Sequence, residues 1–496
     1  MEIEFKLRLP PTAVAALLAD PLLVSAQSTR KRLDNIYFDT PAFDLAKAKT
    51  SLRLRKDGRR WLQTVKSGSS ASAGLHQRQE LEFPVARQAL DWAPLAGTPF
   101  AKQLAPFQST VAAQFRTRFD RQLWLLRGPT GAEIELAIDQ GHILAGKQQQ
   151  DFCEVELELK SGPVNDLFII ALALSARHPL VLDNRSKAQR GNALARQLPL
   201  APPVKATDVL LPDGAGFHAI AHAAVGNCLA QWQDNQDGYL AQTTDLNATE
   251  QDTEYLHQLR VGVRRLRVAC DPLARGAAWQ TDTLAALKKP LRQLGRQLGA
   301  ARDWDVFTEE IWPPLLQSIT DPALRMALQE EIQLQRSLAH LQAHAALCGR
   351  AAQQVLLQLS HCLSQPPLDK TPPTALYKQL NDYAQELKQG VRELHHLQRE
   401  PLHALRIVAK KMRYLTEFIA SRHAEADVEP WLKWLKKAQE VLGARNDRST
   451  AEIRISQLCQ AIPAHHGKVR RALRAALKAQ PLDELDLSMP PGAYWG

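Results

Sequence analysis

The chain has 496 residues, of which 45% are hydrophobic, so it predicts two or three domains with a real core. Its net charge of +10 permits an anionic partner without identifying one. Six cysteines are scattered without a CxxC pair, which argues against a zinc site and indicates a reducing cytoplasm.

Two features argue against export or a membrane. Residue 2 is charged and the first segment is typical of a strand, so we expect no cleavable signal sequence. The most apolar stretch, residues 167–176, is too short to span a bilayer. The sequence therefore predicts a cytoplasmic protein with no membrane partner.

Charged and apolar residues alternate in two distant segments. In a strand, successive side chains point to opposite faces, so the charges of residues 1–8 share one face. The same holds for residues 153–160. The charges in question are Glu2, Glu4, Lys6 and Arg8 in the first segment and Glu154, Glu156, Glu158 and Lys160 in the second.

Clustered carboxylates on one face repel each other unless a cation lies over them. Divalent cations favour carboxylate oxygens, and lysine and arginine suit phosphate oxygens. A solvated outer strand face is the simpler interpretation of either segment alone. Two such segments, with further charged alternation between them, favour a site for a metal–polyphosphate substrate.

The first 200 residues are rich in predicted strands. Further charged alternations occur at residues 51–55, 78–82, 114–118 and 133–139, and a Trp61–Lys66 strand follows an Asp-Gly turn signal. Helices are expected at residues 13–18 and 164–176. Roughly eight strands with one charged face each are best explained by a closed antiparallel barrel with a polar interior.

The remainder of the chain is predicted to be helical and contains an internal repeat. A Pro/Gly-rich linker at residues 201–215 precedes it. Residues 257–267 (HQLRVGVRRLR) are matched by residues 403–413 (HALRIVAKKMR). In each copy a histidine and three cations fall on one helical stripe, and a Leu-Gly-Ala motif follows about forty residues later. The repeat predicts two homologous helical bundles.

Five motifs of the first half resemble the CYTH, or triphosphate tunnel metalloenzyme, family. They are Glu2-x-Glu4-x-Lys6, Leu52-Arg53-Leu54-Arg55, Arg78-x-Glu80-x-Glu82, Glu154-x-Glu156-x-Glu158-x-Lys160 and Ser186-Lys187-x-x-Arg190-Gly191. The helical half resembles the CHAD domain. Together they imply a two-domain α+β protein, with a tunnel barrel and flanking helices followed by an all-α domain of two repeats. The expected domains are a CYTH domain at 1–200, a CHAD domain at 216–480 (repeats about 216–365 and 374–480) and a tail at 481–496.

The CYTH resemblance implies metal-dependent hydrolysis of inorganic triphosphate. Mg²⁺ or Mn²⁺ would be held by Glu2, Glu4, Glu154, Glu156 and Glu158. The residues expected to grip the triphosphate or to act in catalysis include Glu2, Glu4, Lys6, Arg53, Arg55, Lys66, Arg78, Glu80, Glu82, Arg116, Arg118, Lys160, Lys187 and Arg190. No side chain stands out as a general base, so water activation is left to a metal.

Two alternatives remain open for the barrel. One is an organic triphosphate substrate, because CYTH members include thiamine triphosphatases and adenylate cyclases. The other is a barrel without activity attached to a polyanion-binding module, although the intact ExExK motif argues against loss of activity. From the sequence, residues 1–205 alone are expected to hydrolyse triphosphate.

The CHAD resemblance implies binding of inorganic polyphosphate, with association with polyphosphate granules left open. The expected ligand residues are His257, Arg260, Arg264, Arg267, Lys289, Arg292, His403, Arg406, Lys410, Arg413, Lys433 and Lys436. The stripes predict two basic surfaces, since cations at i, i+3 and i+7 repel each other without a partner. A solvated helix face is the simpler reading of either stripe, and His257 and His403 fit a structural role equally well. Polyphosphate is preferred to nucleic acid, because Tyr414 is the only aromatic residue near either stripe.

Overall fold

A computed structural model describes residues 2–72, 75–242, 252–273, 281–365, 367, 372–461, 466–479 and 486–495 of the chain. The chain divides into two compact units. The first contains residues 1–202 and 348–364, and the second contains residues 203–347 and 365–496. The domain boundaries expected from the sequence remain predictions, but the division shows that a short segment of the helical half packs with the first unit.

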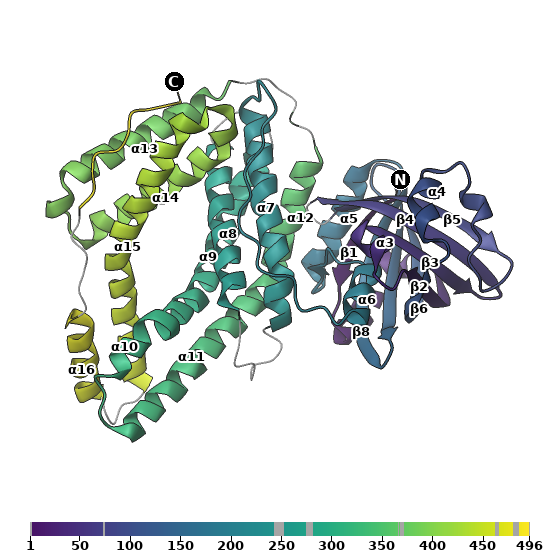
Figure 1. Cartoon of the computed structure of the whole chain (residues 1–496), viewed down its shortest axis with the longest axis horizontal. Coiled ribbons are helices and arrows are strands. Elements are labelled where there is room, and N and C mark those ends of the chain that lie inside the picture. The colour runs from purple at the N-terminus through teal and green to yellow at the C-terminus, as the bar shows by residue number, and fades with distance from the viewer. Residues whose placement is uncertain are drawn as a thin grey trace. The chain divides into compact units, whose positions relative to one another are not determined.

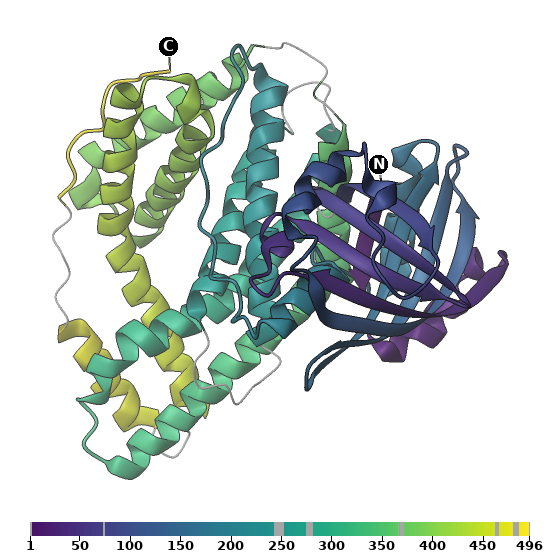
Figure 2. The ribbon, with the colours of Figure 1, turned by 45° about the vertical axis from the view of Figure 1, so that its right-hand side comes forward.

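The first unit is built on a closed antiparallel barrel. Its strands follow the order β5-β4-β3-β2-β6-β7-β8-β1, and β1 pairs again with β5 to close the ring. Figures 1 and 2 show this barrel in purple and blue. The strands of the described residues are β1 (Glu2–Arg8), β2 (Ser28–Asp39), β3 (Thr50–Asp57), β4 (Arg60–Ser72), β5 (Leu75–Val85), β6 (Ala112–Arg127), β7 (Glu133–Ala145), β8 (Gln148–Ser161) and the short β9 (Val181–Leu182), which also pairs with β1.

Alternation along the strands separates a charged interior from an apolar outer layer. Lys6 of β1 lies opposite Glu156 of β8, and both side chains line the cavity inside the barrel. The intervening Phe5 points outward and packs edge-on against Phe168 of α5 (Val164–Arg177), with ring centroids 5.0 Å apart. The closed barrel with a polar interior is therefore confirmed.

Helix α6 (Lys187–Ala195) carries the SKxxRG motif into the barrel wall. Ser186 and Gln189 form a capping box, in which each side chain accepts a hydrogen bond from the backbone N–H of the other residue. Gly191 lets the helix approach β6, because a Cβ there would lie 2.0 Å from the ring of Phe115. The motif thus fixes where α6 begins and how closely it packs.

Short helices complete the first unit. They are η1 (Pro11–Ala13), α1 (Val14–Leu18), α2 (Pro21–Val24), α3 (Asp44–Lys47), η2 (Ala93–Leu95), α4 (Pro99–Leu104), η3 (Ala105–Phe107) and, from the helical half of the sequence, α12 (Arg350–Ser364).

The second unit consists of helices in the part of the chain that the structure describes. They are α7 (Phe217–Gln242), α8 (Thr253–Leu273), α9 (Thr281–Val306), η4 (Phe307–Ile311), α10 (Trp312–Leu316), α11 (Pro322–Cys348), α13 (Thr374–Arg392), η5 (Leu394–His396), α14 (Arg399–Ile419), η6 (Ala420–Arg422), α15 (Glu425–Ala461) and α16 (His466–Ala479). The two histidine–arginine stripes lie on α8 and α14, which contact each other, and the Leu-Gly-Ala motifs lie on α9 and α15. The all-α class of this half is confirmed.

The segment before α7 is irregular but is held against the second unit. The side chain of Asn235 on α7 exchanges two hydrogen bonds with the backbone of Val204. Val209, further along this segment, is a buried residue, and its carbonyl accepts a hydrogen bond from the hydroxyl of Ser421. The expected linker is therefore irregular in structure but packed over part of its length.

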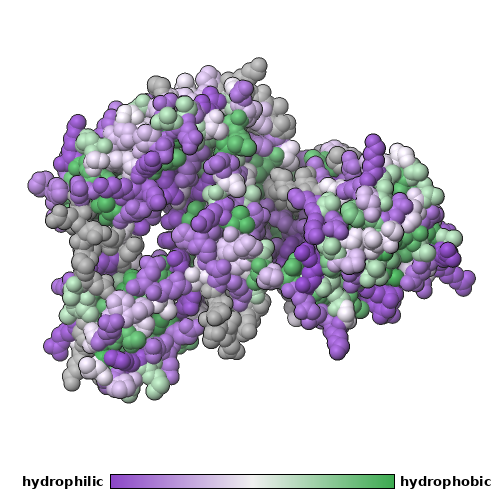
Figure 3. Space-filling model, viewed as in Figure 1, coloured by the Kyte–Doolittle hydropathy of each residue, from purple (hydrophilic) through white to green (hydrophobic). Residues whose placement is uncertain are grey.

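Among the described residues, no helix combines the length and apolar character that crossing a membrane requires. Hydrophilic residues cover much of the face shown in Figure 3, and hydrophobic residues form small scattered groups there.

Candidate functional site

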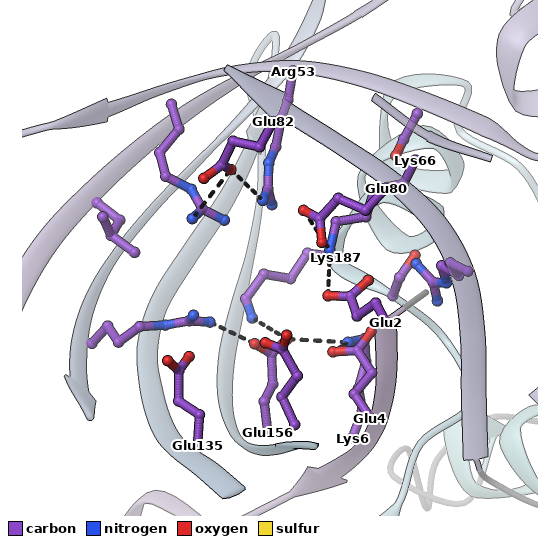
Figure 4. A pocket seen from close by; sticks show the side chains of 18 of the residues that line it. Glu2, Glu4, Lys6, Arg53, Lys66, Glu80, Glu82, Glu135, Glu156 and Lys187 are labelled. Atoms are coloured by element: carbon purple, nitrogen blue, oxygen red, sulfur yellow. Dashed lines mark hydrogen bonds and ion pairs between the residues drawn. The ribbon is translucent and has the colours of Figure 1, made fainter. Parts of the chain in front are cut away.

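The barrel encloses a cavity of about 550 Å³ whose walls are dominated by charged side chains (Figure 4). Every strand of the ring contributes at least one lining residue. The described basic residues are Lys6, Lys31, Arg53, Arg55, Lys66, Arg78, Arg121, Lys160 and Lys187, and the acidic residues are Glu2, Glu4, Asp57, Glu80, Glu82, Glu135, Glu156 and Glu158.

Two lysines connect the carboxylates of β1 with those of other strands. The Lys6 ammonium lies 2.5 Å from Glu4 and 3.3 Å from Glu156. Burial alone would raise the pKa of Glu4, but the charges of Lys6 and Lys66 and the hydrogen bond from Lys6 together outweigh it and lower that pKa to about 2. The Lys66 ammonium lies 2.5 Å from Glu2 and 3.2 Å from Glu80. Each of these carboxylates therefore lies close to a lysine ammonium.

The arginines of β3 form a cationic wall on another side of the cavity. Arg53 and Arg55 both lie 3.9 Å from Glu82. Burial, then repulsion by Arg53 and Arg121, lowers the pKa of Arg55 to about 10. Burial and cationic neighbours therefore disfavour the charged form of Arg55, and an anion bound beside it would stabilise that form.

The deepest carboxylates surround the ammonium of Lys187. Oxygens of Asp139, Glu154 and Glu156 lie within 4.8 Å of one another, a spacing that could hold a metal ion. Lys187 occupies this cluster, at 2.6 Å from Asp139 and 3.1 Å from Glu156, and it also pairs with Glu154. Burial would lower the pKa of Lys187, but the three carboxylates raise it above its ordinary value. The cluster is therefore already neutralised by the protein.

Most of the expected catalytic residues line the cavity, but three of them, Arg116, Arg118 and Arg190, do not, and neither does the expected metal ligand Glu154. Arg116 and Arg118 lie on the outer face of β6, where both pair with Asp34, so the expectation that they face the substrate is wrong. Phe119 of the same strand lines the cavity, and residues an odd number of positions away from it, such as Arg116 and Arg118, point to the opposite face. Glu154 and Arg190 pair with each other beside Lys187 instead of lining the cavity.

The sequence interpretation missed several residues of the cavity. Arg121 pairs with Asp139 at 2.6 Å and with Glu156 at 2.5 Å, and Glu135 lies 3.6 Å from Lys160. Lys31 also lines the cavity. Arg121 lies two residues after Phe119 and therefore on the same face of β6. Had the face of Phe119 been taken as the interior one, Arg121 would have been predicted to line the cavity.

In the second unit, α8 and α14 each place three residues of their histidine–cation stripe around one cavity of about 400 Å³. The expected two surfaces are thus a single site. Its described basic residues are His257, Arg260, Arg264, Arg302, Arg406, Lys410, Arg413 and Lys436, and its acidic residues are Asp303, Glu310 and Glu440.

Arg260 shows how the Leu-Gly-Ala motif shapes this cavity. A Cβ on Gly299 of α9 would lie 3.4 Å from Nε of Arg260, so the glycine leaves room for the guanidinium. Asp303 of the same motif lies 3.7 Å from Arg260. Burial, followed by repulsion from Arg264, still lowers the pKa of Arg260 to about 10. This cavity therefore also carries unneutralised positive charge.

Five of the expected polyphosphate residues do not line this cavity. Arg267 is half-buried beside Gly295, and Lys433 pairs with Glu429 on the surface. The other three are exposed and are Lys289, Arg292 and His403. The side chains of residues 444–447, which include the second motif's Arg445 and Asp447, lie outside the described part of the chain.

Comparison with protein families agrees with both architectures. The CYTH domain family matches residues 1–191, and the CHAD domain family matches residues 223–456. The chain is a CYTH domain followed by a CHAD domain.

Similar proteins match parts of the chain. The CYTH domain region resembles the inorganic triphosphatase of Haemophilus influenzae (strain Rd), with 36% identity over 197 residues, or 39% of this chain. The chain spans about half (54%) of the length of that curated relative. A crystal structure of a Ricinus communis CHAD domain shares 27% identity, covering 57% of this chain and 98% of the other, with a TM-score of 0.44. A Hippeastrum protein described as having a dominant triphosphatase activity shares 22% identity over 39% of this chain and 96% of its own, with a TM-score of 0.31.

The CYTH fold implies a divalent metal, and the barrel offers carboxylate oxygens that fit one. Glu2 Oε2 and Glu4 Oε1 are buried without a hydrogen-bond partner in the described structure. Buried anionic oxygens without a partner are costly, and a cation bound between them would remove that cost. We therefore favour Glu2 and Glu4 of β1 as metal ligands over the carboxylates of the cluster that Lys187 fills.

Proposed function

We propose that the CYTH domain hydrolyses inorganic triphosphate to pyrophosphate and phosphate with the help of a divalent metal, Mg²⁺ or Mn²⁺. The observation that carries the proposal is the cavity wall, which contains both Arg55, whose charged form is disfavoured by burial and by other arginines, and the buried carboxylate oxygens of Glu2 and Glu4 without partners. Such a wall suits a substrate that is itself a polyanion with bound metal. The resemblance to a relative named inorganic triphosphatase supports the same activity.

In this proposal the cations of the cavity bind and orient the substrate. Arg53, Arg55 and Arg121 would hold phosphate oxygens, because guanidinium groups bind phosphate in a bidentate manner. Lys6 and Lys66 would stabilise charge that develops on the transferring phosphoryl group. Both lysines are already fixed by glutamate partners, so little reorganisation is needed when the substrate binds.

Glu2 and Glu4 would hold the metal, and Glu156 and Glu158 line the same cavity. When bound, the metal supplies positive charge for the phosphate oxygens and an activated water. Glu4 keeps its charge at neutral pH, since Lys6 and Lys66 together outweigh the effect of burial and lower its pKa to about 2. Burial, then Glu2 and Glu135, raise the pKa of Glu158, although Lys160 opposes the shift.

An organic triphosphate is the main competitor. A nucleoside or thiamine substrate would be recognised by an available aromatic ring. The ring of Tyr37 stacks on Phe115 at 4.5 Å, and the ring of Phe119 contacts both Phe152 and the Lys187 ammonium. The two aromatic rings that line the described cavity are thus engaged within the protein, which supports an inorganic substrate.

The test is phosphate release from equal concentrations of tripolyphosphate, pyrophosphate, long polyphosphate, ATP and thiamine triphosphate, with Mg²⁺, with Mn²⁺ and without metal. We expect the highest kcat/KM for tripolyphosphate, with pyrophosphate and phosphate as products in ³¹P NMR. A preference for ATP or thiamine triphosphate would replace the proposal with the organic alternative.

We further propose that the CHAD domain binds inorganic polyphosphate in the cavity between α8 and α14. Its eight basic side chains, His257 included, face three carboxylates, and the lowered pKa of Arg260 indicates an unmet preference for an anion. Two aromatic residues, Tyr414 and Phe307, lie among the described lining residues, which gives little support for stacking of nucleic-acid bases. Binding titrations with polyphosphate and with duplex DNA at equal phosphate concentration and physiological salt test this choice. Equal affinity for DNA would make the site a general polyanion binder.

A further inference from the structure

Helix α12 comes from the helical half of the sequence but packs within the barrel unit. Figure 1 shows it beside α5. Its buried residues include Gln353, Leu356 and Ser360. The neighbouring Gln354 donates through Nε2 to the carbonyl of Leu172 at 2.8 Å and to Ser175 Oγ at 2.5 Å, both on α5. These contacts attach α12 to the outer layer of the barrel.

One of these contacts reaches the strand that carries the ExExK motif. Oε1 of the fully buried Gln353 accepts a hydrogen bond of 2.9 Å from the backbone N–H of Leu182 in β9. Strand β9 pairs with Leu7 and Arg8 of β1, and the N–H of the next residue, Asp183, donates to the carbonyl of Lys6 at 3.0 Å. Strand β9 therefore connects the side chain of Gln353 to the backbone of β1 near Lys6.

A second path runs through aromatic rings. Phe5, which lies between Glu4 and Lys6 in the sequence, packs on Phe168 of α5, and the Phe168 ring lies 4.9 Å from the ring of His361 on α12. Nε2 of His361 lies 2.6 Å from Oδ1 of Asn165 at the start of α5. Both paths end on the segment of β1 whose Glu4 and Lys6 point into the cavity.

We infer that α12 is a structural part of the triphosphatase domain and that Gln353 is a positioning residue for the active-site strand β1. The bond from Leu182 satisfies a buried backbone N–H that β9 would otherwise leave without a partner, so its loss loosens β9. Strand β9 in turn fixes the backbone of Lys6, and a displacement of about 1 Å at catalytic groups can lower turnover severely. This inference rests on the proposed triphosphatase activity and deepens it.

The inference changes what is expected of the isolated N-terminal half. A fragment of residues 1–205 lacks α12 and would expose the face of α5 that carries Leu172, Ser175 and Phe168. The sequence alone predicts that this fragment is active, whereas the packing gives a physical reason to expect weak folding or low activity. Activity of the barrel would then depend on a helix supplied by the CHAD region.

The test compares two variants of the full chain, Gln353→Met and Gln354→Met. Both remove hydrogen bonds between α12 and the barrel unit, but only the first removes the bond to β9. For Gln353→Met we expect kcat for tripolyphosphate to fall about tenfold with KM changed less than about twofold. Amide hydrogen exchange should become faster in β1 and β9. For Gln354→Met we expect kcat and exchange in β1 and β9 to stay close to those of the wild type.

The outcomes distinguish a failure of the positioning role of Gln353 from a failure of the proposed triphosphatase activity. A folded Gln353→Met protein with wild-type kcat and unchanged exchange in β1 and β9 would overturn the positioning role. Absence of tripolyphosphate hydrolysis by the wild type would overturn the proposed function, while the exchange comparison would still test the role of Gln353. If Gln353→Met does not fold, Gln353→Asn withdraws the same acceptor by one methylene group, and the same results are expected of it.

Discussion

Lys187 and Asp139 form a buried ion pair in which the ammonium nitrogen lies 2.6 Å from Oδ2 of the aspartate. Lys187 comes from α6 and Asp139 from β7, so the pair joins the helix that carries the SKxxRG motif to the barrel wall. It also means that the deepest carboxylate cluster is neutralised by the protein itself. The metal-binding role in our account therefore falls to the carboxylates nearer the open cavity.

Replacing Lys187 with Met should strongly destabilise the barrel. The substitution leaves the buried Asp139 and Glu154 with fewer counter-charges, and breaking a buried pair typically costs about 3–5 kcal/mol. Lys31→Met is the matched control, because Lys31 is half-exposed and pairs with Asp57 on the rim, a type of pair worth about 0–1 kcal/mol. Urea unfolding measures both. Equal losses in the two variants would show that the Lys187 cluster is not a stabilising feature.

The stability of the barrel should depend on pH through Glu4. Its folded-state pKa of about 2 lies below its ordinary value of 4.5, so its ionised form contributes stability fully above about pH 4.5. That contribution is lost as the pH falls towards 2. We expect the difference in free energy of unfolding between wild type and Glu4→Gln to narrow over this range, as measured by denaturant titrations at several pH values. A difference that stays constant would contradict the assigned Lys6–Glu4 interaction.

Arginines on opposite faces of the wall should differ in their effect on turnover. Arg55→Ala removes a cation from the cavity, and we expect kcat/KM for tripolyphosphate to fall about 100- to 1000-fold, as for loss of other groups that stabilise transition-state charge. Arg118→Ala removes an outer-face arginine that pairs with Asp34, and kcat/KM should stay within about twofold of wild type. Steady-state kinetics of the two proteins decides whether the cavity or the outer face holds the substrate.

How far the sequence could predict this site depended on the pattern of each strand. Strand β1 and residues 153–160 of β8 have charges on one face only, so alternation alone placed Glu4, Lys6 and Glu156 correctly. Strand β6 carries charges on both faces, with Arg116 and Arg118 outside and Arg121 inside. Alternation cannot tell which face of such a strand is the interior, because that depends on which side the other strands close.

Long-range packing set the other limits. The helical repeat was visible because matching residues recur at a fixed spacing, but the merging of two stripes into one cavity depends on the contact between α8 and α14. Likewise, nothing local to α12 indicates that Gln353 bonds to Leu182, 171 residues earlier in the chain.

Polyphosphate binding should depend on the residues that line the CHAD cavity. Arg264→Ala combined with Lys410→Ala removes two lining cations, so polyphosphate affinity should fall and its dependence on salt should become shallower by about two in log–log slope. Triphosphate hydrolysis should be unchanged, since the barrel keeps its own cations. Lys433→Ala is the control, because Lys433 lies on the same set of helices but pairs with Glu429 outside the cavity. A larger loss of affinity in the control, measured by titration at several salt concentrations, would place the polyphosphate site elsewhere.

The most direct test of the central claim is the rate of tripolyphosphate hydrolysis by wild type and Glu4→Gln at saturating Mg²⁺ or Mn²⁺, with EDTA as the metal-free condition. Circular dichroism and the unfolding temperature show whether the variant is folded. The account predicts that EDTA abolishes wild-type activity and that folded Glu4→Gln loses at least about 100-fold in kcat/KM, because the metal loses a carboxylate oxygen that is buried without another partner. Full turnover by Glu4→Gln at saturating metal, or wild-type activity that resists EDTA, would contradict it.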